Sequence, residues 1–273
     1  MSFPPVRFSL PLLNARFLLL MLLLLLASVG RANELTLAVD LGLTPKQAQQ
    51  SYKPLISYLQ KATGQRIRLQ SSANALAHWE KMRREHFDLV LDNPAFTAYR
   101  AERMGYTVIG KLPDVLSFTL VAQVDEMMFE PGELIGRTVA SQPSPSMTAL
   151  RLAELYTNPM QQPEYVQADT HMQALELVEQ GRAVGAMVPT GLVAGFPNVT
   201  PLYTTDQLPA PALSVSDRVS PELREKIRNA MLDAHNSREG RAMLDALNVP
   251  QFEPANNDVY AGLETLLDGL FGY

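Results

Sequence analysis

The sequence of 273 residues contains no cysteine and one tryptophan, and its aromatic residues make up only 7%. Without cysteine there is no disulfide framework, thiolate metal site or cysteine nucleophile. Basic residues are also scarce, because 23 Lys and Arg face 28 Asp and Glu and the net charge is −5. A nucleic-acid-binding surface needs clustered Lys and Arg to neutralise phosphates, so we expect no nucleic-acid partner.

Long hydrophobic runs are missing except at the N-terminus. There, 11 apolar residues at 17–27 follow Arg7 and Arg16 and precede small residues up to Ala32. A spanning helix needs roughly 20 apolar residues, so we prefer a cleaved secretory signal peptide, residues 1–32, over a retained membrane anchor. Cleavage leaves 241 residues with a net charge of −8, and no Cys at that site could carry a lipid. The pattern therefore predicts export to the periplasm.

The next part of the sequence alternates between strand and helix patterns. We predict strands at 35–39, 66–70, 87–91 and 106–110, with helices at 75–85 and 94–104 between them. Thr44 and Pro45 begin another helix, which Pro54 should interrupt, so that the helix restarts near Ser51 and ends at Gly64. Strands separated by helices of about ten residues predict an α/β fold.

A second α/β series follows an extended run at 116–124. Its predicted strands are 137–140, 164–167 and 184–188, and its helices start after Ser146 and near residue 170. The C-terminal part is helical, with segments from Ser220 and at 239–247 and 258–271. These patterns predict two lobes, each a mixed sheet flanked by helices: residues 33–118 with 207–273 form lobe 1 and residues 119–206 form lobe 2. The crossing segments are expected near 118–124 and 203–208.

Several catalytic motifs are incomplete. The segment GYTVIGKL at 105–112 lacks the Ser or Thr that a P-loop places after its Lys. The histidines His78, His86, His171 and His235 are not spaced to chelate one ion, and no Gly-x-Ser-x-Gly elbow is present. If the protein were a hydrolase, Ser146 and His171 would be its only candidate catalytic residues. We therefore expect a protein that is not an enzyme and needs no metal or cofactor.

The segment RTVASQPSPSMT at 137–148 combines a strand, a Ser/Pro-rich turn and the start of a helix. With Ser146 as N-cap, the amides of Met147 and Thr148 and the hydroxyls of Ser146 and Thr148 would converge at a positive dipole end. Such a helix start can hold an oxyanion without any full positive charge. Alternatively, Ser146 only caps its own helix.

Five segments of the chain together resemble a known family: the periplasmic solute-binding proteins of phosphate, phosphite and phosphonate ABC transporters, which have the type II periplasmic-binding-protein fold. These segments are YKPLISYLQKATGQRI, FDLVLDNPAF, RTVASQPSPSMT, THMQALELVEQGRAVGAM and SPELREKIRNAML, at 52–67, 87–96, 137–148, 170–187 and 220–232. Their order and spacing carry the resemblance along nearly all of the mature chain.

The resemblance implies several ligand contacts. The family holds phosphonyl oxygens at a Ser-Thr-Ser-Gly turn, which here reads Ser146, Met147, Thr148 and Ala149, and it has a His near the ligand where this chain has His171. The sequence departs from the family elsewhere. Ala75 and Asp92 stand where the family has tyrosines that reach the ligand, and Val184 stands where it has an acid that engages a ligand amine.

Asp92 is the departure with the largest consequence. A carboxylate beside an oxyanion is unfavourable if desolvated and unpaired, so Asp92 faces away, binds a cationic group, or marks a ligand that is no phosphonate. The predicted ligand-binding residues are Ser146, Met147, Thr148, His171, Asp92, Asn93 and Ser144.

From these features we predict a monomeric periplasmic solute-binding component of an ABC transporter. Its two lobes would close over a small anionic or zwitterionic, phosphonate- or phosphate-like ligand, and the membrane permease would be its partner. The alternative is a periplasmic ligand-sensing module for a membrane histidine kinase or receptor.

Overall fold

A computed structural model describes residues 34–40, 43–84 and 87–268. The predicted signal peptide, His86 and residues 269–271 of the last predicted helix lie outside the described residues. No described helix is both long enough and apolar enough to cross a membrane.

The first sheet has five strands in the order β2-β1-β3-β12-β4. Their bounds are β1 (Leu35–Asp40), β2 (Ile67–Ser71), β3 (Leu89–Asp92), β4 (Tyr106–Lys111) and β12 (Ala212–Ser216). β1 is parallel to β2 and β3, whereas β12 is antiparallel to β3 and β4. The sequence analysis missed β12, which returns from the later part of the chain and lies between two predicted strands.

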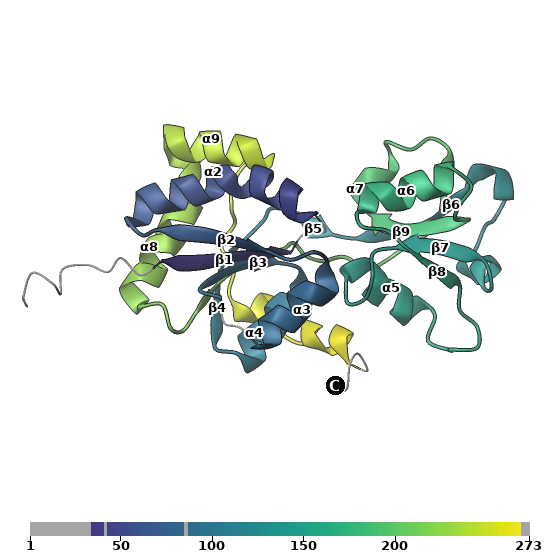
Figure 1. Ribbon diagram of the computed structural model, residues 1–273, viewed down its shortest axis with the longest axis horizontal. Helices are drawn as coiled ribbons and strands as arrows, with labels where there is room; N and C mark the ends of the chain where they lie inside the picture. Colours follow the sequence, from purple (N-terminus) through teal and green to yellow (C-terminus); the bar gives the residue numbers. More distant parts are fainter. Residues whose placement is uncertain (1–33, 41–42, 85–86, 269–273) are drawn as a thin grey trace, which may run out of the picture. The chain divides into compact units, whose positions relative to one another are not determined.

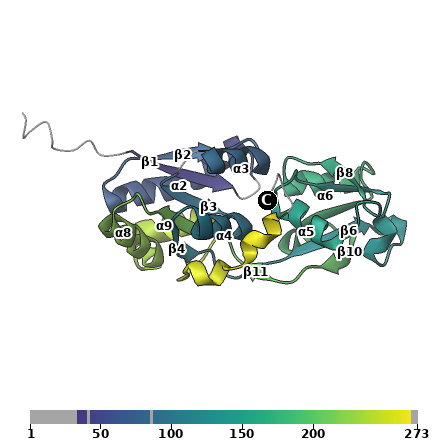
Figure 2. The same cartoon turned by 90° about the horizontal axis from the view of Figure 1, so that it is seen from below.

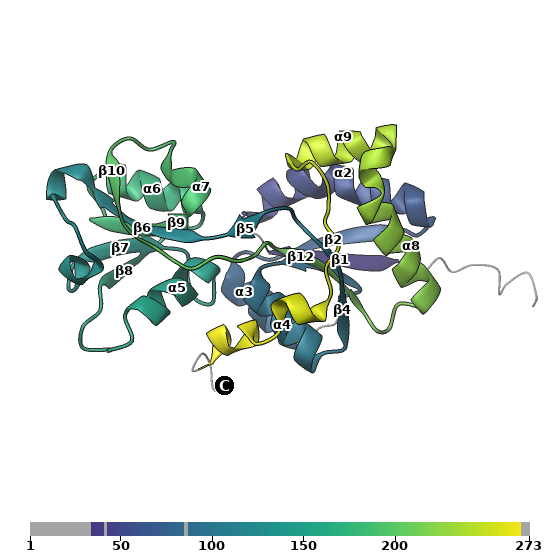
Figure 3. The same cartoon turned by 180° about the vertical axis from the view of Figure 1, so that it is seen from behind.

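Alternate residues of these strands face two separate cores, as the period of a strand requires. Leu37 and Leu89 pack with α2 (Pro45–Thr63), α8 (Pro221–Leu232) and α9 (Arg238–Leu247). Ala38 and Val90 face the other side, with α3 (Ala75–Arg84) and α4 (Pro94–Arg103). Figures 1 and 3 show α2 and α9 on one side of the sheet and α3 and α4 on the other.

Helix α2 corrects the prediction that Pro54 interrupts it, because the helix runs without a break from Pro45 to Thr63. A proline inside a helix costs about 3 kcal/mol through its missing N–H and its clash with the preceding turn. Tyr52, Leu55 and Leu59 flank Pro54 and are buried against the sheet, so packing on both sides outweighs that cost. The helix ends at Gly64, as predicted, in the left-handed conformation with φ 75°.

The second sheet has the order β10-β6-β9-β7-β8. Its strands are β6 (Phe118–Gln123), β7 (Thr138–Ser141), β8 (Glu164–Gln167), β9 (Gly185–Pro189) and β10 (Val199–Thr204). α5 (Met147–Leu155) packs on one face, and α6 (His171–Glu179) and the short α7 (Thr190–Val193) lie on the other (Figure 1). Two 3₁₀ segments, η1 (Val124–Glu126) and η2 (Pro131–Leu134), precede β7.

The chain passes between the two sheets through short strands. β5 (Val115–Leu116) pairs with β11 (Leu208–Pro209) in a separate two-stranded sheet. The prediction of a crossing at 118–124 was therefore wrong, because those residues form β6 inside the second sheet. Both faces of β6 are buried: Leu120 and Val121 are 0% exposed although they point to opposite sides.

The C-terminal part includes α8, η3 (Ala234–Asn236), α9, η4 (Asn257–Tyr260) and η5 (Leu263–Leu267). The helix predicted at 258–271 is instead two 3₁₀ segments where the structure describes it. Gly262, with φ 86°, separates these segments because a left-handed residue cannot continue a helix. Tyr260 and Leu267 are buried, and Figure 2 shows this segment beside α4.

Candidate functional site

A cavity of about 160 Å³ lies where several helices begin. It is lined by Leu43, Asn74, Ala75, Asn93, Leu116, Phe118, Gln142, Ser146, Met147, Asp169, His171, Pro189 and Pro211. These residues include or adjoin the first residues of α3, α4, α5 and α6, and Leu43 directly precedes the N-cap of α2. Helix starts carry free N–H groups and partial positive charge, and none of the described lining residues is Lys or Arg. The cavity is therefore suited to an anion held by neutral donors.

The start of α5 leaves two backbone N–H groups unpaired, and one of them belongs to Met147, which lines the cavity. Ser146 is its N-cap, with φ −62° and ψ 155°, and its Oγ accepts a hydrogen bond from the Ala149 N–H at 3.2 Å. Within the described part of the chain, the N–H groups of Met147 and Thr148 have no hydrogen-bond acceptor. Ser146 thus caps its own helix, as one of the two alternatives from the sequence stated, and the amides of Met147 and Thr148 stay unpaired.

The hydroxyls of this turn are bonded to one another. Ser146 Oγ lies 3.0 Å from the Gln142 carbonyl oxygen and 3.1 Å from Thr148 Oγ1, and Ser141 Oγ donates to Thr148 Oγ1 at 3.0 Å. Thr148 is 0% exposed and does not line the cavity. Its side chain therefore stabilises the turn, while Ser146 and Met147 form part of the cavity wall.

His171 is the first residue of α6 and also lines the cavity. Burial lowers the pKa of its imidazole from 6.5 to about 4, so the ring is neutral near pH 7. Its buried Nδ1 has no hydrogen-bond partner among the described residues. A neutral imidazole can donate from one nitrogen and accept at the other, so His171 can bind a polar ligand atom without adding charge.

Two asparagines line the cavity from the first sheet's helices. Asn93 Oδ1 accepts from the Phe96 N–H at 3.0 Å, and Asn74 Oδ1 accepts from the Ala77 N–H at 2.9 Å. Because each oxygen caps a helix, each Nδ2 remains as a donor group with two hydrogens. Asn93, a predicted site residue, thus lies in the cavity together with Ser146, Met147 and His171.

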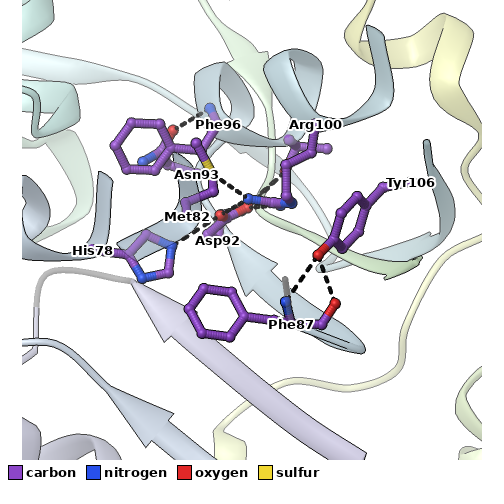
Figure 4. Close-up of polar contacts among 9 residues, drawn as sticks. His78, Met82, Phe87, Asp92, Asn93, Phe96, Arg100 and Tyr106 are labelled. Atoms are coloured by element: carbon purple, nitrogen blue, oxygen red, sulfur yellow. Dashed lines mark hydrogen bonds and ion pairs between the residues drawn. The ribbon is translucent and has the colours of Figure 1, made fainter. Parts of the chain in front are cut away.

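Asp92 is placed away from the cavity. Its side chain is 0% exposed and forms an ion pair with Arg100, and its Oδ1 accepts from Arg100 Nη2 at 2.6 Å and from Thr97 Oγ1 at 3.0 Å. His78 Nε2 lies 3.4 Å from its Oδ2, and Figure 4 shows the side chains of His78 and Arg100 directed at the carboxylate. The expectation that Asp92 contacts the ligand is therefore not met in this structure, because its charge is already neutralised inside the first sheet's core.

The pKa of Asp92 agrees with this arrangement. Burial by itself raises the pKa of the carboxyl, but the charge and hydrogen bonds of Arg100, with those of His78, hold it below its usual value of 3.8. Asp92 is thus ionised and internally paired. Of the three alternatives drawn from the sequence, the one in which it faces away describes this structure.

Ser144 does not line this cavity either. It contributes to a separate cavity of about 310 Å³, together with Leu152, Tyr165 and Gln167 among others. The turn at Ser141–Ser144 borders that second cavity, and Gln142 lines both. Trp79 is 1% exposed and stacks on Phe96, so it belongs to the core.

Gln142 and Asp169 line the cavity but were not among the residues predicted from the sequence. Gln142 follows β7 directly and Asp169 follows β8 by two residues, and these two strands are parallel. Ligands of α/β sheets bind beyond the carboxyl ends of parallel strands, so this position was the signal that could have identified both. Among the described residues, no three His, Cys, Asp or Glu side chains gather to hold a metal ion.

Residues 38–260 match the sequence profile of a family described as the periplasmic substrate-binding protein of phosphonate ABC transporters. The chain belongs to this family. As a family member it is a periplasmic binding component that takes up a small-molecule ligand and works with a membrane permease, and it is not an enzyme. The match favours transport over the sensing alternative. No curated protein sequence matches this family member.

Solved structures agree with the fold of the family. PhnD1 from Prochlorococcus marinus, solved with methylphosphonate, has a TM-score of 0.74 at 12% identity, covering 86% of this chain and 97% of its own. XAC2383 from Xanthomonas citri, solved with ATP, has a TM-score of 0.72 at 14% identity, covering 86% of this chain and 98% of its own. A binding component of a phosphonate ABC transporter from Pseudomonas aeruginosa has a TM-score of 0.71 at 12% identity, covering 85% of this chain and 84% of its own. The predicted two-lobed α/β fold is confirmed.

Proposed function

We propose that this transport protein binds a small phosphonate- or phosphate-like anion, or a zwitterion carrying such a group, in the 160 Å³ cavity. The observation that carries the proposal is the unpaired amide of Met147, a cavity-lining residue at the start of α5. An unpaired N–H group at the positive end of a helix is a ready site for an oxyanion. Asn93 and His171 would add neutral donors from other helices.

The volume and lining of the cavity limit the rest of the ligand. A volume of about 160 Å³ is below the roughly 300–1,000 Å³ of pockets for drug-sized ligands, so the ligand is small. Seven of the thirteen lining residues are apolar: Leu43, Ala75, Leu116, Phe118, Met147, Pro189 and Pro211. An apolar wall of this kind favours a ligand with a short carbon chain next to its anionic group.

Ligand-driven closure would supply the transport signal. In this proposal the lobes, residues 33–118 with 207–273 and residues 119–206, move about the paired strands β5 and β11. The ligand stabilises the closed form only to the extent that it binds that form more tightly than the open one. We further propose that the exported protein loses residues 1–32, acts as a monomer and binds no nucleic acid.

Replacing Met147 with Pro tests the amide donor directly. Met147 is the first residue of α5, where proline fits because its φ is already helical and no intrahelical bond is lost. The preceding Ser146 has ψ 155°, the extended conformation that a residue before proline prefers. Met147→Pro thus removes one N–H from the cavity and preserves the helix.

The matched control is Met147→Ala, which also removes the side chain but keeps the amide. One charge-assisted hydrogen bond contributes about 1.5–3 kcal/mol. We expect calorimetry with methylphosphonate to show Met147→Pro weaker than Met147→Ala by about that amount, with equal melting temperatures for the two variants. Equal affinities of the two variants would mean that the ligand does not use this amide.

A further inference from the structure

The second cavity, about 310 Å³ in volume, is formed by α5, β8 and the turn after β7. Its volume reaches the range of roughly 300–1,000 Å³ that is typical of ligand pockets. It is lined by Ser141, Gln142, Pro143, Ser144, Ala149, Leu152, Ala153, Gln162, Tyr165, Val166 and Gln167. None of these described residues is Lys, Arg, His, Asp or Glu, so the cavity suits a neutral ligand.

One polar group of this cavity has no partner inside the protein. The oxygen atom Ser144 Oγ is buried and forms no hydrogen bond with any described residue. A buried hydroxyl without a hydrogen bond is unfavourable, and such groups are rare in folded proteins. A bound molecule with a donor or an acceptor near Ser144 would therefore remove this cost.

The strand β8 is the outer strand of the second sheet, and half of its main chain faces away from that sheet. The N–H groups of Glu164 and Ala168 donate to carbonyl oxygens in or next to β7, each at 2.9 Å. Residues of a strand turn alternately toward and away from a neighbouring strand, so Tyr165 and Gln167 direct their N–H and C=O groups outward. No strand in the described part of the chain pairs with that side of β8.

The outward-facing main chain of β8 borders the second cavity. Successive side chains of a strand point to opposite faces of the sheet, yet Tyr165, Val166 and Gln167 all line this one cavity. Their common position indicates that the cavity is bordered by their main chain as well as by side chains. Figures 1 and 3 show α5 next to β8. The cavity is thus a groove between a helix and an open sheet edge, and we call it the β8–α5 groove.

The opposite edge of the same sheet is protected. There, β10 contains Pro201, which has no N–H, and its register shifts between Pro201 and Tyr203. Prolines and bulges are common devices that keep an edge strand from pairing with another chain. β8, with the sequence EYVQ, has no proline and pairs with β7 in an unbroken register. The edge without protection is therefore the one that borders a cavity.

We propose that the β8–α5 groove is a second binding site and that its ligand is a short, uncharged peptide in the extended conformation. The peptide would pair with Tyr165 and Gln167 as an added strand, because its main chain offers the same alternation of donors and acceptors. Ala149 and Ala153 are four residues apart on one side of α5, so their small side chains leave space for an apolar side chain of the peptide. This site goes beyond the proposed function, because binding of the anion in the first cavity does not require it.

The test uses the neutral peptide acetyl-Ala-Val-Ala-amide. An NMR titration of isotope-labelled protein should show saturable shifts of the amide signals of Tyr165 and Gln167. The control ligand is the same peptide with every backbone nitrogen methylated, which keeps the side chains but has no N–H to donate. We expect the control ligand to bind at least about tenfold more weakly.

Two protein variants test the edge and the groove separately. Tyr165→Pro removes the outward N–H without breaking a bond to β7, and Tyr165→Ala is its matched control, because it also removes the side chain but keeps the N–H. Ala153→Phe fills the groove from an exposed position on α5 and leaves the main chain unchanged. We expect Tyr165→Pro to bind the peptide at least about tenfold more weakly than Tyr165→Ala, and Ala153→Phe to show a similar loss against the natural protein.

Three outcomes would overturn the proposal. The first is the absence of any shift at Tyr165 and Gln167 with the natural protein, and the second is equal binding of the methylated peptide. The third is a dimer of the natural protein in sedimentation experiments that Tyr165→Pro abolishes, because the edge would then be occupied by a second copy. Melting temperatures of Tyr165→Pro and Ala153→Phe close to that of the natural protein would show that a loss of binding is local.

Discussion

The buried pair of Asp92 and Arg100 leads to a prediction about stability. Replacing Arg100 with Met removes the guanidinium and leaves the Asp92 carboxylate at 0% exposure without its counter-charge. Removing one partner of a buried ion pair costs about 3–5 kcal/mol, a large part of the roughly 5–15 kcal/mol that stabilises a folded domain. We expect Arg100→Met to lower the free energy of unfolding by about this amount at pH 7.

The loss of stability in Arg100→Met should also depend on pH, in a direction that the pKa of Asp92 determines. In the natural protein the pKa of Asp92 lies below 3.8, so its ionised form stabilises the fold above that pH, and this stabilisation is lost as the pH falls through the lower folded pKa. In Arg100→Met burial raises the pKa of Asp92 instead. The unfavourable buried charge then takes up a proton more readily, so the difference between the variant and the natural protein should shrink as the pH is lowered from 7.

Urea unfolding measures both effects. Trp79 is the single tryptophan of the chain and packs in the same core as Asp92, so its fluorescence reports on this part of the protein. The double variant Asp92→Asn/Arg100→Met removes both charges and should recover most of the loss. Lys61→Met, which breaks the exposed pair with Glu239, should change stability little.

Two results would refute this reasoning. A loss below about 1 kcal/mol in Arg100→Met would show that the pair is not a buried neutralised charge. If the double variant regained its stability but no longer bound methylphosphonate, Asp92 would act on the ligand rather than on the core.

Two further predictions concern the cavity and the second sheet. Because the folded pKa of His171 is about 4 against 6.5 in the unfolded chain, the ligand-free protein should lose stability as the pH falls from about 6.5 to about 4; thermal melts of His171→Asn should lack this loss, and equal slopes would contradict the assignment. A Cβ on Gly185 would lie 2.6 Å from the Val121 carbonyl oxygen, so Gly185→Ala should destabilise the fold by about 1–3 kcal/mol. Gly191→Ala, whose Cβ meets nothing within 4 Å, is its control, and similar melting temperatures for both would count against the close contact.

Local signals in the sequence were sufficient to predict most of the helices and strands. Thr44 with Pro45, Ser146 and Ser220 with Pro221 mark helix starts at the positions where α2, α5 and α8 begin. Each works through bonds between residues three apart, so no distant part of the chain is needed. Pro54 shows the limit of local reasoning, because the packing that keeps α2 continuous comes from residues far away in sequence.

The elements that were missed depend on long-range contacts. β12 is a short strand near Pro209 and Pro211, and its place between β3 and β4 follows from pairing across about a hundred residues. The role of Asp92 was open for the same reason: its position in FDLVLDNPAF does not reveal that Arg100, two turns along α4, neutralises it. Asp169 needed the parallel order of β7 and β8 before its side chain could be assigned to the cavity.

The group proposed to bind the anion at the start of α5 belongs to the main chain, and this bears on how such a protein can change. Every amino acid other than proline brings the same amide hydrogen, so an exchange at position 147 leaves it in place. Mutation can therefore reshape the surroundings of a bound ligand while its anchoring point persists. A lineage built this way could diversify in what it carries without passing through forms that have lost the ability to hold an oxyanion.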